Sequence, residues 1–346
     1  MFAQLKRDGT EDPSKSHQGM GMSTYLGGAW GTTEKNYNKI NFTDFNKEAL
    51  KETVVGGWAA IVQHYFVAAW IPDAKAKNHF TSRANDKGEY FIGFSSPDIT
   101  VNAGMQNSIS AKLYAGPKIQ DELAKLSTGL DLTVDYGWLW FIAQFLFWLL
   151  KNIHGFLGNW GWSIVGLTIV VKLAFFHLSA TSYKSMANMR RVAPEMQRIK
   201  EQYGSDRQKT SQAMMDLYKK EKINPVSGCL PMLVQMPVFL ALYWTLMESV
   251  ELRHAPWLLW ITDLAAMDKF FVLPLIMGAT MYIQQLLNPQ PTDPMQAKVL
   301  KIMPVMFTVF MLWFPSGLVL YWVVNNTLSI VQQWIITRQI EGAKAK

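Results

Sequence analysis

The sequence contains little cysteine, histidine and charge. It has one cysteine, Cys229, and six histidines among 346 residues. A single cysteine excludes an intramolecular disulfide framework and any cysteine-based zinc or iron–sulfur site. Six scattered histidines leave little for a histidine metal cluster, so we expect neither a metal nor a cofactor. Charged residues make up 17% of the chain, below the roughly 25% that is usual for soluble domains.

The chain divides into two unlike halves. Residues 1–135 carry 14 basic and 15 acidic side chains, whereas residues 136–346 carry 19 basic and 11 acidic ones and nearly all the long apolar runs. Because the positive charge accompanies apolar sequence and forms no polar stripe, we expect no nucleic acid to bind directly. The distribution predicts an α-helical polytopic membrane protein with a soluble head.

The head, residues 1–134, is predicted to be a β-sandwich. Short runs at 34–45, 57–71, 89–94 and 109–113 are separated by Gly, Asn, Asp and Pro, which is typical of such folds. Pro117 suits the first turn of a helix that would continue to residue 126. Residues 2–12 are polar and contain no export signal. We therefore expect that the sequence begins downstream of the natural N-terminus or that the head stays inside the cell.

Apolar stretches follow from residue 138. The stretch 138–150 covers about 20 Å as a helix, less than the roughly 30 Å hydrocarbon core, and its Trp and Phe side chains favour the headgroup boundary. We expect an interfacial amphipathic helix over 135–157, with a full span as the alternative. Because only Pro315 and Ser316 separate the last two spans, we expect a tight antiparallel hairpin there. The five predicted transmembrane spans are 160–178, 229–247, 270–287, 299–314 and 317–336.

Loop charges predict the orientation of these spans. Residues 183–222 carry ten Lys and Arg against five acidic residues, and residues 248–269 carry two against four. The positive-inside rule places the first loop and the tail, 341–346, in the cytoplasm, and the head outside. Within the cytoplasmic segment 183–224, helical stretches at 185–203 and 206–222 predict a charged hairpin. Both a solvated connector and a docking platform fit this hairpin.

Lys172 is the most informative residue within the spans. The five spans contain no Asp or Glu, and the chain has no nucleophile or nucleotide-binding motif, so an enzyme has little support. A charge at mid-helix costs roughly 2.5–3.5 kcal/mol. Lys172 either snorkels to the headgroups or faces a water-filled cavity, with Thr168 one turn earlier on the same face.

The last span carries a polar stripe. Tyr321, Asn325, Ser329 and Gln332 recur at spacings of four, four and three. Hydrogen bonds between helices explain this stripe, and so does a hydrated groove that faces Lys172. Methionines in the other spans either fill gaps or form a surface that accepts many apolar partners. They are Met232, Met236, Met247, Met277, Met281, Met303, Met306 and Met311.

Several stretches resemble one family. DLYKKEKINPVSGCLPMLVQMPVFLALY (216–243), SVELRHAPWLLWITDL (249–264), TDPMQ (292–296) and FPSGLVLYW (314–322) closely resemble the YidC/Oxa/Albino family of membrane protein insertases. DYGWLWFIAQ (135–144) and GGWAAIVQHYFVAAWIP (56–72) are similar to its Gram-negative form, which has a large periplasmic β-sandwich. The resemblance implies a five-transmembrane-helix insertase core (158–340) with a partial extracytoplasmic β-sandwich, in the bacterial inner membrane. The family's first transmembrane helix and the early part of its periplasmic domain are missing before Met1, which leads us to expect a truncated sequence.

The resemblance also implies a function without covalent chemistry. Such proteins insert nascent membrane proteins into the lipid bilayer and help them fold, alone or with the Sec translocon, through a hydrophilic groove open to the cytoplasm. Further implied partners are the signal recognition particle receptor and the ribosome, although the short tail weakens a ribosome-binding role. The alternative is a channel or transporter in which an intramembrane lysine and the polar stripes line the path.

The resemblance assigns roles to individual residues. Lys172 takes the place of the groove charge, where many relatives carry arginine, and Thr168 lies beside it. Tyr321 and Trp322 match an aromatic pair that contacts substrate, with Trp322 replacing a common tyrosine. The complete set of expected substrate-binding residues is Lys172, Thr168, Tyr321, Trp322, Asn325, Met232, Met236 and Met306.

Overall fold

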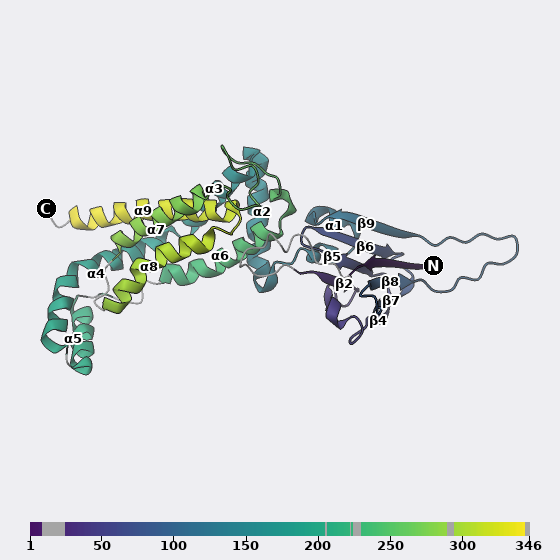
Figure 1. Ribbon diagram of the computed structural model, residues 1–346, viewed down its shortest axis with the longest axis horizontal. Coiled ribbons are helices and arrows are strands. Elements are labelled where there is room, and N and C mark those ends of the chain that lie inside the picture. The colour runs from purple at the N-terminus through teal and green to yellow at the C-terminus, as the bar shows by residue number, and fades with distance from the viewer. Residues whose placement is uncertain (9–24, 205, 222, 224–229, 289–293, 343–346) are drawn as a thin grey trace. The chain divides into compact units, whose positions relative to one another are not determined.

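The computed structural model describes residues 1–8, 25–204, 206–221, 223, 230–288 and 294–342. The chain forms two compact units. Met1–Gly137 and Glu248–Glu251 make up the first, which we call the head unit, and Trp138–Met247 and Leu252–Lys346 make up the second, the helical unit. Strands dominate the head unit and helices the helical unit (Figure 1).

The described part of the head unit contains two antiparallel sheets. The strand orders are β1-β8-β7-β4 and β3-β2-β5-β6-β9, so the predicted β-rich head is confirmed. The predicted run 57–71 is divided into β5 and β6, which a turn joins through the N–H of Gln63 and the carbonyl oxygen of Phe66. The strands are β1 (Phe2–Arg7), β2 (Gly27–Gly31), β3 (Asn38–Asn41), β4 (Lys51–Val55), β5 (Trp58–Val62), β6 (Phe66–Pro72), β7 (Lys77–Ala84), β8 (Tyr90–Ser95) and β9 (Ala111–Pro117).

The five-stranded sheet is covered on both faces. On one face Ala59 and Ile61 pack against Phe80 and Phe94 of the other sheet. On the opposite face Ala60 and Val62 belong to a second core with Leu123 of α1 (Gln120–Leu126). Every residue of the central strand β5 is consequently buried. A strand covered on both faces has a continuous apolar sequence in place of alternation, as Trp58–Val62 does.

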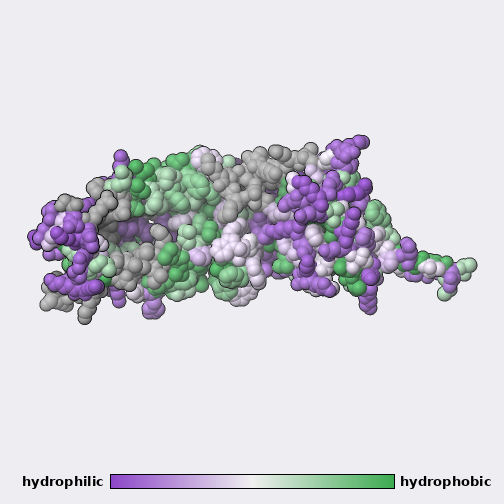
Figure 2. Space-filling model, turned by 90° about the horizontal axis from the view of Figure 1, so that it is seen from below, coloured by the Kyte–Doolittle hydropathy of each residue, from purple (hydrophilic) through white to green (hydrophobic). Residues whose placement is uncertain are grey.

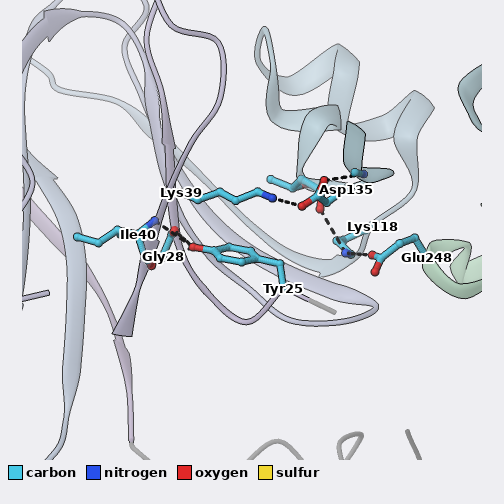
Figure 3. A network of polar contacts seen from close by, with 9 residues as sticks. Tyr25, Gly28, Lys39, Ile40, Lys118, Asp135 and Glu248 are labelled. Atoms are coloured by element: carbon cyan, nitrogen blue, oxygen red, sulfur yellow. Dashed lines mark hydrogen bonds and ion pairs between the residues drawn. The ribbon is translucent and has the colours of Figure 1, made fainter. Parts of the chain in front are cut away.

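Two ion pairs fasten the C-terminal part of the head unit. The Lys118 ammonium group donates to Glu248 at 2.8 Å and to the Thr133 carbonyl oxygen at 3.2 Å. The side chains of Lys118 and Glu248 are only 2% and 4% exposed. On β3, Lys39 pairs with Asp135 (Figure 3). The head unit thus includes residues that follow helix α6 in the sequence.

The described part of the helical unit consists of eight α-helices. α9 packs along α7, α3 and α4, while α8 packs along α7 and α2 along α3. Short 3₁₀ helices lie in the head unit at Phe42–Asp44 and Leu130–Thr133. Two more, Gly137–Leu139 and Val250–Leu252, lie where the sequence passes from one unit to the other. The helices are α2 (Trp140–Leu157), α3 (Trp160–Ala174), α4 (Phe176–Tyr203), α5 (Arg207–Lys220), α6 (Leu230–Glu248), α7 (Val272–Leu287), α8 (Pro294–Met311) and α9 (Ser316–Gly342).

The predicted helical core is confirmed, but the five spans remain a prediction. Over the described residues, no helix alone combines the length and the apolar composition needed to cross a membrane. The pair α3 and α4 has both only when its two helices, inclined by 68°, are taken together. The helices α7 and α8 are also offset from the predicted spans by two to five residues at their starts.

The first predicted span is broken near its end. α3 stops at Ala174, and α4 starts at Phe176 and continues through the segment predicted as the first helix of the hairpin, which was expected to begin at residue 185. Ser179, Ser182 and Tyr183 are buried, where α4 packs against α9. The local sequence does not indicate this packing, and the helix starts at Phe176 where residue 185 was predicted. The following helix, α5, begins after Asp206, whose side chain caps it.

The tight antiparallel hairpin expected around Pro315 and Ser316 stays a prediction. Only residues 312–315 separate α8 from α9, but both helices pack mainly along α7. The rings of Phe307 and Trp322 lie between them, with centroids 5.3 Å apart.

Candidate functional site

The structure joins Lys172 to the polar stripe of α9. Lys172 lies in the last turn of α3, and its ammonium group donates to the Ser329 hydroxyl at 2.7 Å. Ser329 in turn donates to the carbonyl oxygen of Asn325 at 2.7 Å. A helix C-terminus stabilises a nearby cation by about 0.3–1 kcal/mol. The break after Ala174 therefore places the charge at a helix end, where the sequence predicted the interior of a continuous span.

The charge of Lys172 is solvated by dipoles and not neutralised by an acid. Among the described residues Lys172 forms no salt bridge. Ser329, its hydrogen-bond acceptor, also interacts with the hydroxyl of Tyr183 on α4. Three helices thus meet at one serine hydroxyl. Such a site leaves the positive charge available to an anionic group that enters it.

Thr168 and Asn325 line the same contact between α3 and α9 in different ways. Thr168 is buried and donates to the Ile164 carbonyl oxygen of its own helix at 2.7 Å, so its proton is not presented to α9. The side-chain oxygen of Asn325 is buried and has no hydrogen-bond partner among the described residues. A donor that reached this oxygen would remove an unfavourable unpaired group.

Tyr321 and Trp322 occupy two distinct environments. Tyr321 is buried, and its hydroxyl accepts a hydrogen bond from the Gln235 amide of α6 at 2.5 Å. Trp322 is half-buried between Phe239 of α6 and Phe307 of α8. The sequence does not indicate a partner for Gln235, because a single glutamine in a span has no periodic neighbour.

Gln332 of the stripe and two polar neighbours on α9, Asn326 and Gln333, form hydrogen bonds to other segments. Asn326 donates to Thr280 of α7 at 3.3 Å, and Gln333 donates to Asn288 at 3.0 Å. Gln332 donates to the Phe176 carbonyl oxygen at 3.2 Å, directly at the break between α3 and α4. Interhelical hydrogen bonding therefore accounts for Gln332 of the stripe, while the hydrated groove facing Lys172 stays a prediction.

The methionines expected to contact substrate lie on an apolar surface where the structure describes them. Met236 of α6 and Met306 of α8 are exposed, whereas the side chain of Met232 falls outside the described residues. Figure 2 shows a hollow in this unit, bordered by apolar residues and, toward the end with α4 and α5, by hydrophilic ones. Exposed apolar residues of α6 and α8 include Leu233, Met236, Val299, Ile302, Val305, Met306 and Val309.

The groups described around Lys172 are hydroxyls, a backbone carbonyl oxygen and a helix end. Within the described ranges, no cluster of three His, Cys, Asp or Glu side chains that could hold a metal occurs. An ammonium group and hydroxyl donors are groups that can hold an anion by charge and hydrogen bonding, whereas the helix end stabilises the ammonium group itself.

Comparisons with known proteins match both units. The family model described as "60Kd inner membrane protein" matches residues 152–344, and the model "YidC periplasmic domain" matches residues 1–149. Proteins named "Membrane protein insertase YidC" from Ectopseudomonas mendocina and Stutzerimonas stutzeri are both 64% identical, over 99% of this chain. The one from Pseudomonas aeruginosa strain LESB58 is 63% identical over 99% of the chain. The chain spans 59% of the first and third of these relatives and 62% of the second.

A solved structure shares the fold. A crystal structure described as an active YidC insertase with its first transmembrane domain resolved matches with a TM-score of 0.51 and 20% identity. The match covers 80% of this chain and 75% of that one. At this identity the likeness concerns the fold alone. Since one family model covers more than half of the chain and a second covers nearly all the rest, the chain belongs to the 60Kd inner membrane protein family, in its YidC form.

Proposed function

We propose that this chain acts as a membrane protein insertase and chaperone in the bacterial inner membrane. The names of relatives about 64% identical support this proposal. The observation that carries it is the Lys172 ammonium group, hydrogen-bonded to Ser329 at a helix end and unpaired with any acid among the described residues. A half-buried cation of this kind is costly in a membrane, and this cost supports a functional role.

The proposed mechanism uses charge first and apolar contact second. An acidic or polar N-terminal tail of a nascent membrane protein is drawn to Lys172, and the unpaired oxygen of Asn325 accepts one of its N–H groups. The apolar segment of the substrate then passes along the exposed surface around Met236 and Met306 into lipid. Thr168, Tyr321, Trp322 and Met232 complete the proposed substrate path.

We assign the membrane topology as part of the same proposal. The five spans lie over α3, α6, α7, α8 and α9, and the head unit is periplasmic. α2 is the interfacial helix, since it exposes Trp140, Phe145 and Trp148 while it buries Leu146 and Leu150. The basic pair α4 and α5 is cytoplasmic and is the surface we assign to the signal recognition particle receptor and the ribosome. The Sec translocon is a proposed partner within the membrane.

Reconstitution tests this proposal directly. The purified chain in lipid vesicles should make a small single-span substrate resistant to protease, and Lys172→Glu should lose this protection. Folded protein that protects no more substrate than empty vesicles would contradict the proposal. Ion conductance measured in the same vesicles separates an insertase from a channel, because a channel conducts without any substrate.

A further inference from the structure

The segment between α6 and α7, residues 253–271, is an ordered cap. We call it the cap loop. Within it, the N–H of Leu264 donates to the Ala255 carbonyl oxygen at 3.0 Å. The N–H of Ser316, at the start of α9, donates to the Ala266 carbonyl oxygen at 2.7 Å. The cap loop is therefore fixed both to itself and to the first turn of α9.

A buried carboxylate fixes the cap loop to α7 as well. Asp268 accepts hydrogen bonds from the backbone N–H of Leu273 at 2.8 Å and from the Trp260 indole at 2.9 Å. A carboxylate at a helix N-terminus satisfies free N–H groups and is favoured by the helix dipole. The cap loop also reaches α3, where the rings of Trp257 and Trp162 lie 5.7 Å apart. It thus covers the ends at which α3, α7 and α9 begin.

The cap loop holds strained backbone. In the described part of the chain, the non-glycine residues with positive φ are His254, Leu259 and Phe271, at 58°, 53° and 57°, and all three lie in this loop. Leu259 follows Leu258 in a turn closed by the N–H of Ile261 and the Leu258 carbonyl oxygen at 3.0 Å. Turns with positive φ at this position favour Gly, Asn or Asp. A leucine there is sterically unfavourable, because its Cβ atom crowds the following carbonyl oxygen.

The strained leucine also extends into solvent. Leu259 is 86% exposed, and Leu258, Met267 and Phe270 beside it in the cap loop are exposed too. In water, neither the positive φ of Leu259 nor the exposure of its apolar side chain is favourable. Asparagine would relieve the strain and present a polar side chain. In the acyl region of a bilayer, burial of the apolar side chain away from water is instead favourable. The lipid environment therefore explains why a leucine occupies this position.

The lengths of the covered helices place the cap loop at the right depth. α3 has 15 residues and α7 has 16, which correspond to about 22 Å and 24 Å. Both are shorter than the roughly 30 Å hydrocarbon core. A cap on such short helices lies at the boundary between acyl chains and headgroups, where tryptophan is enriched. Trp257 and Trp260 flank the turn, and Arg253 and Lys269 are suited to the phosphate groups of lipids.

We propose that the cap loop is a lipid anchor: its Leu258–Leu259 tip inserts into the acyl region of the bilayer and fixes the ends of α3, α7 and α9 at that surface. The proposal rests on the proposed membrane topology, in which α3 and α7 are spans, and not on the insertase activity. It identifies the lipid bilayer itself as the partner of this loop.

Depth-dependent quenching tests the anchor in the full chain. Cys229→Ser removes the one cysteine, and Leu259→Cys then carries an environment-sensitive fluorophore in vesicles of phosphatidylethanolamine and phosphatidylglycerol. The matched control is Met105→Cys, a 68% exposed apolar residue of the head unit. We expect acyl-chain spin labels to quench the label at 259 several-fold more than the label at 105, and aqueous iodide to do the opposite. Equal iodide quenching at both positions would overturn the proposal.

A second variant separates the effect of the Leu259 side chain from an effect of misfolding. With the label at Leu258→Cys, Leu259→Asn should keep or raise the melting temperature in detergent, because asparagine tolerates positive φ. The same substitution should shift the label from lipid quenching to iodide quenching. Unchanged lipid quenching would show that Leu259 is not the anchor. Since these readouts need no substrate, a failed insertion assay alongside lipid quenching would reject the proposed function and retain the anchor.

Discussion

The Lys172 ammonium group donates a 2.7 Å hydrogen bond to the Ser329 hydroxyl, which joins the last turn of α3 to α9. The two residues are 157 positions apart in the sequence. The position of the positive charge therefore depends on the packing of α9 and not on α3 alone. Substitutions on both sides of this bond should affect the same step.

Reversal of the charge should impair capture of acidic substrates. We expect Lys172→Glu to reduce insertion of a substrate with an acidic N-terminal tail about tenfold, equal to about 1.4 kcal/mol, because repulsion replaces attraction. Lys172→Arg retains the charge and should stay within about twofold of this rate. Protease protection in vesicles measures the effect. Lys184→Glu, at an exposed position of α4, is the matched control and should insert normally; normal insertion by Lys172→Glu would refute electrostatic capture.

Loss of the Ser329 hydroxyl should displace the lysine without removing its charge. A hydrogen bond to a charged group contributes about 1.5–3 kcal/mol, so we expect Ser329→Ala to lower insertion of acidic tails several-fold. Ser329→Thr keeps the hydroxyl and should restore most of the rate. The reactivity of Lys172 toward an amine-specific reagent provides a second readout, which should rise in Ser329→Ala only. Equal rates and equal reactivity in both variants would show that Ser329 does not position the lysine.

Removal of one partner of the buried pair in the head unit should destabilise that unit. Lys118→Met leaves the Glu248 carboxylate buried without its cation, at a cost of about 3–5 kcal/mol. Lys118→Met combined with Glu248→Leu should recover most of this loss, because neither charge remains. Thermal unfolding of the full chain in detergent measures the change, and hydrogen exchange assigns it to the head unit.

The control for this pair is Lys6→Met. It breaks the ion pair with Glu89, in which the lysine side chain is 55% exposed, and exposed pairs contribute only about 0–1 kcal/mol. A loss in Lys118→Met no larger than that in Lys6→Met would contradict the prediction.

A methyl group at Gly278 should disturb the contact between α7 and α8. A Cβ atom at this position would lie 2.2 Å from the Thr308 hydroxyl oxygen, which itself donates to the Pro304 carbonyl oxygen at 2.7 Å. Overpacking of this kind costs about 1–3 kcal/mol, so Gly278→Ala should lower the melting temperature in detergent. Gly155→Ala in α2 meets no atom within 4 Å and should be neutral or stabilising. The prediction fails if both variants melt alike.

The sequence predicted those parts of the site whose residues recur at helical spacing. The spacing of Tyr321, Asn325 and Ser329 indicated one face of a helix, and Lys172 was conspicuous as a charge in an apolar run. The structure confirms that these two features meet at Ser329. Likewise, the continuous apolar run of β5 reflects its burial on both faces.

The features that the sequence did not predict depend on tertiary contacts. No Pro or Gly marks the break at Phe175, and the buried Ser179 and Ser182 gain their place only from packing against α9. Leu259 has positive φ, which leucine rarely adopts, so the local sequence does not indicate the turn between Leu258 and Ile261. The hydrogen bond between the Gln235 amide and the Tyr321 hydroxyl joins residues 86 positions apart, so neither local sequence indicates it.

The ion pair between Lys118 and Glu248 constrains the order in which the protein matures during synthesis. Glu248 leaves the ribosome 130 residues after Lys118, and α2 to α6 are translated in between. Until then the head unit lacks four of its residues, Glu248–Glu251, and carries a lysine whose buried site has no counterion. The head unit can therefore reach its final stability only after α6 has been made.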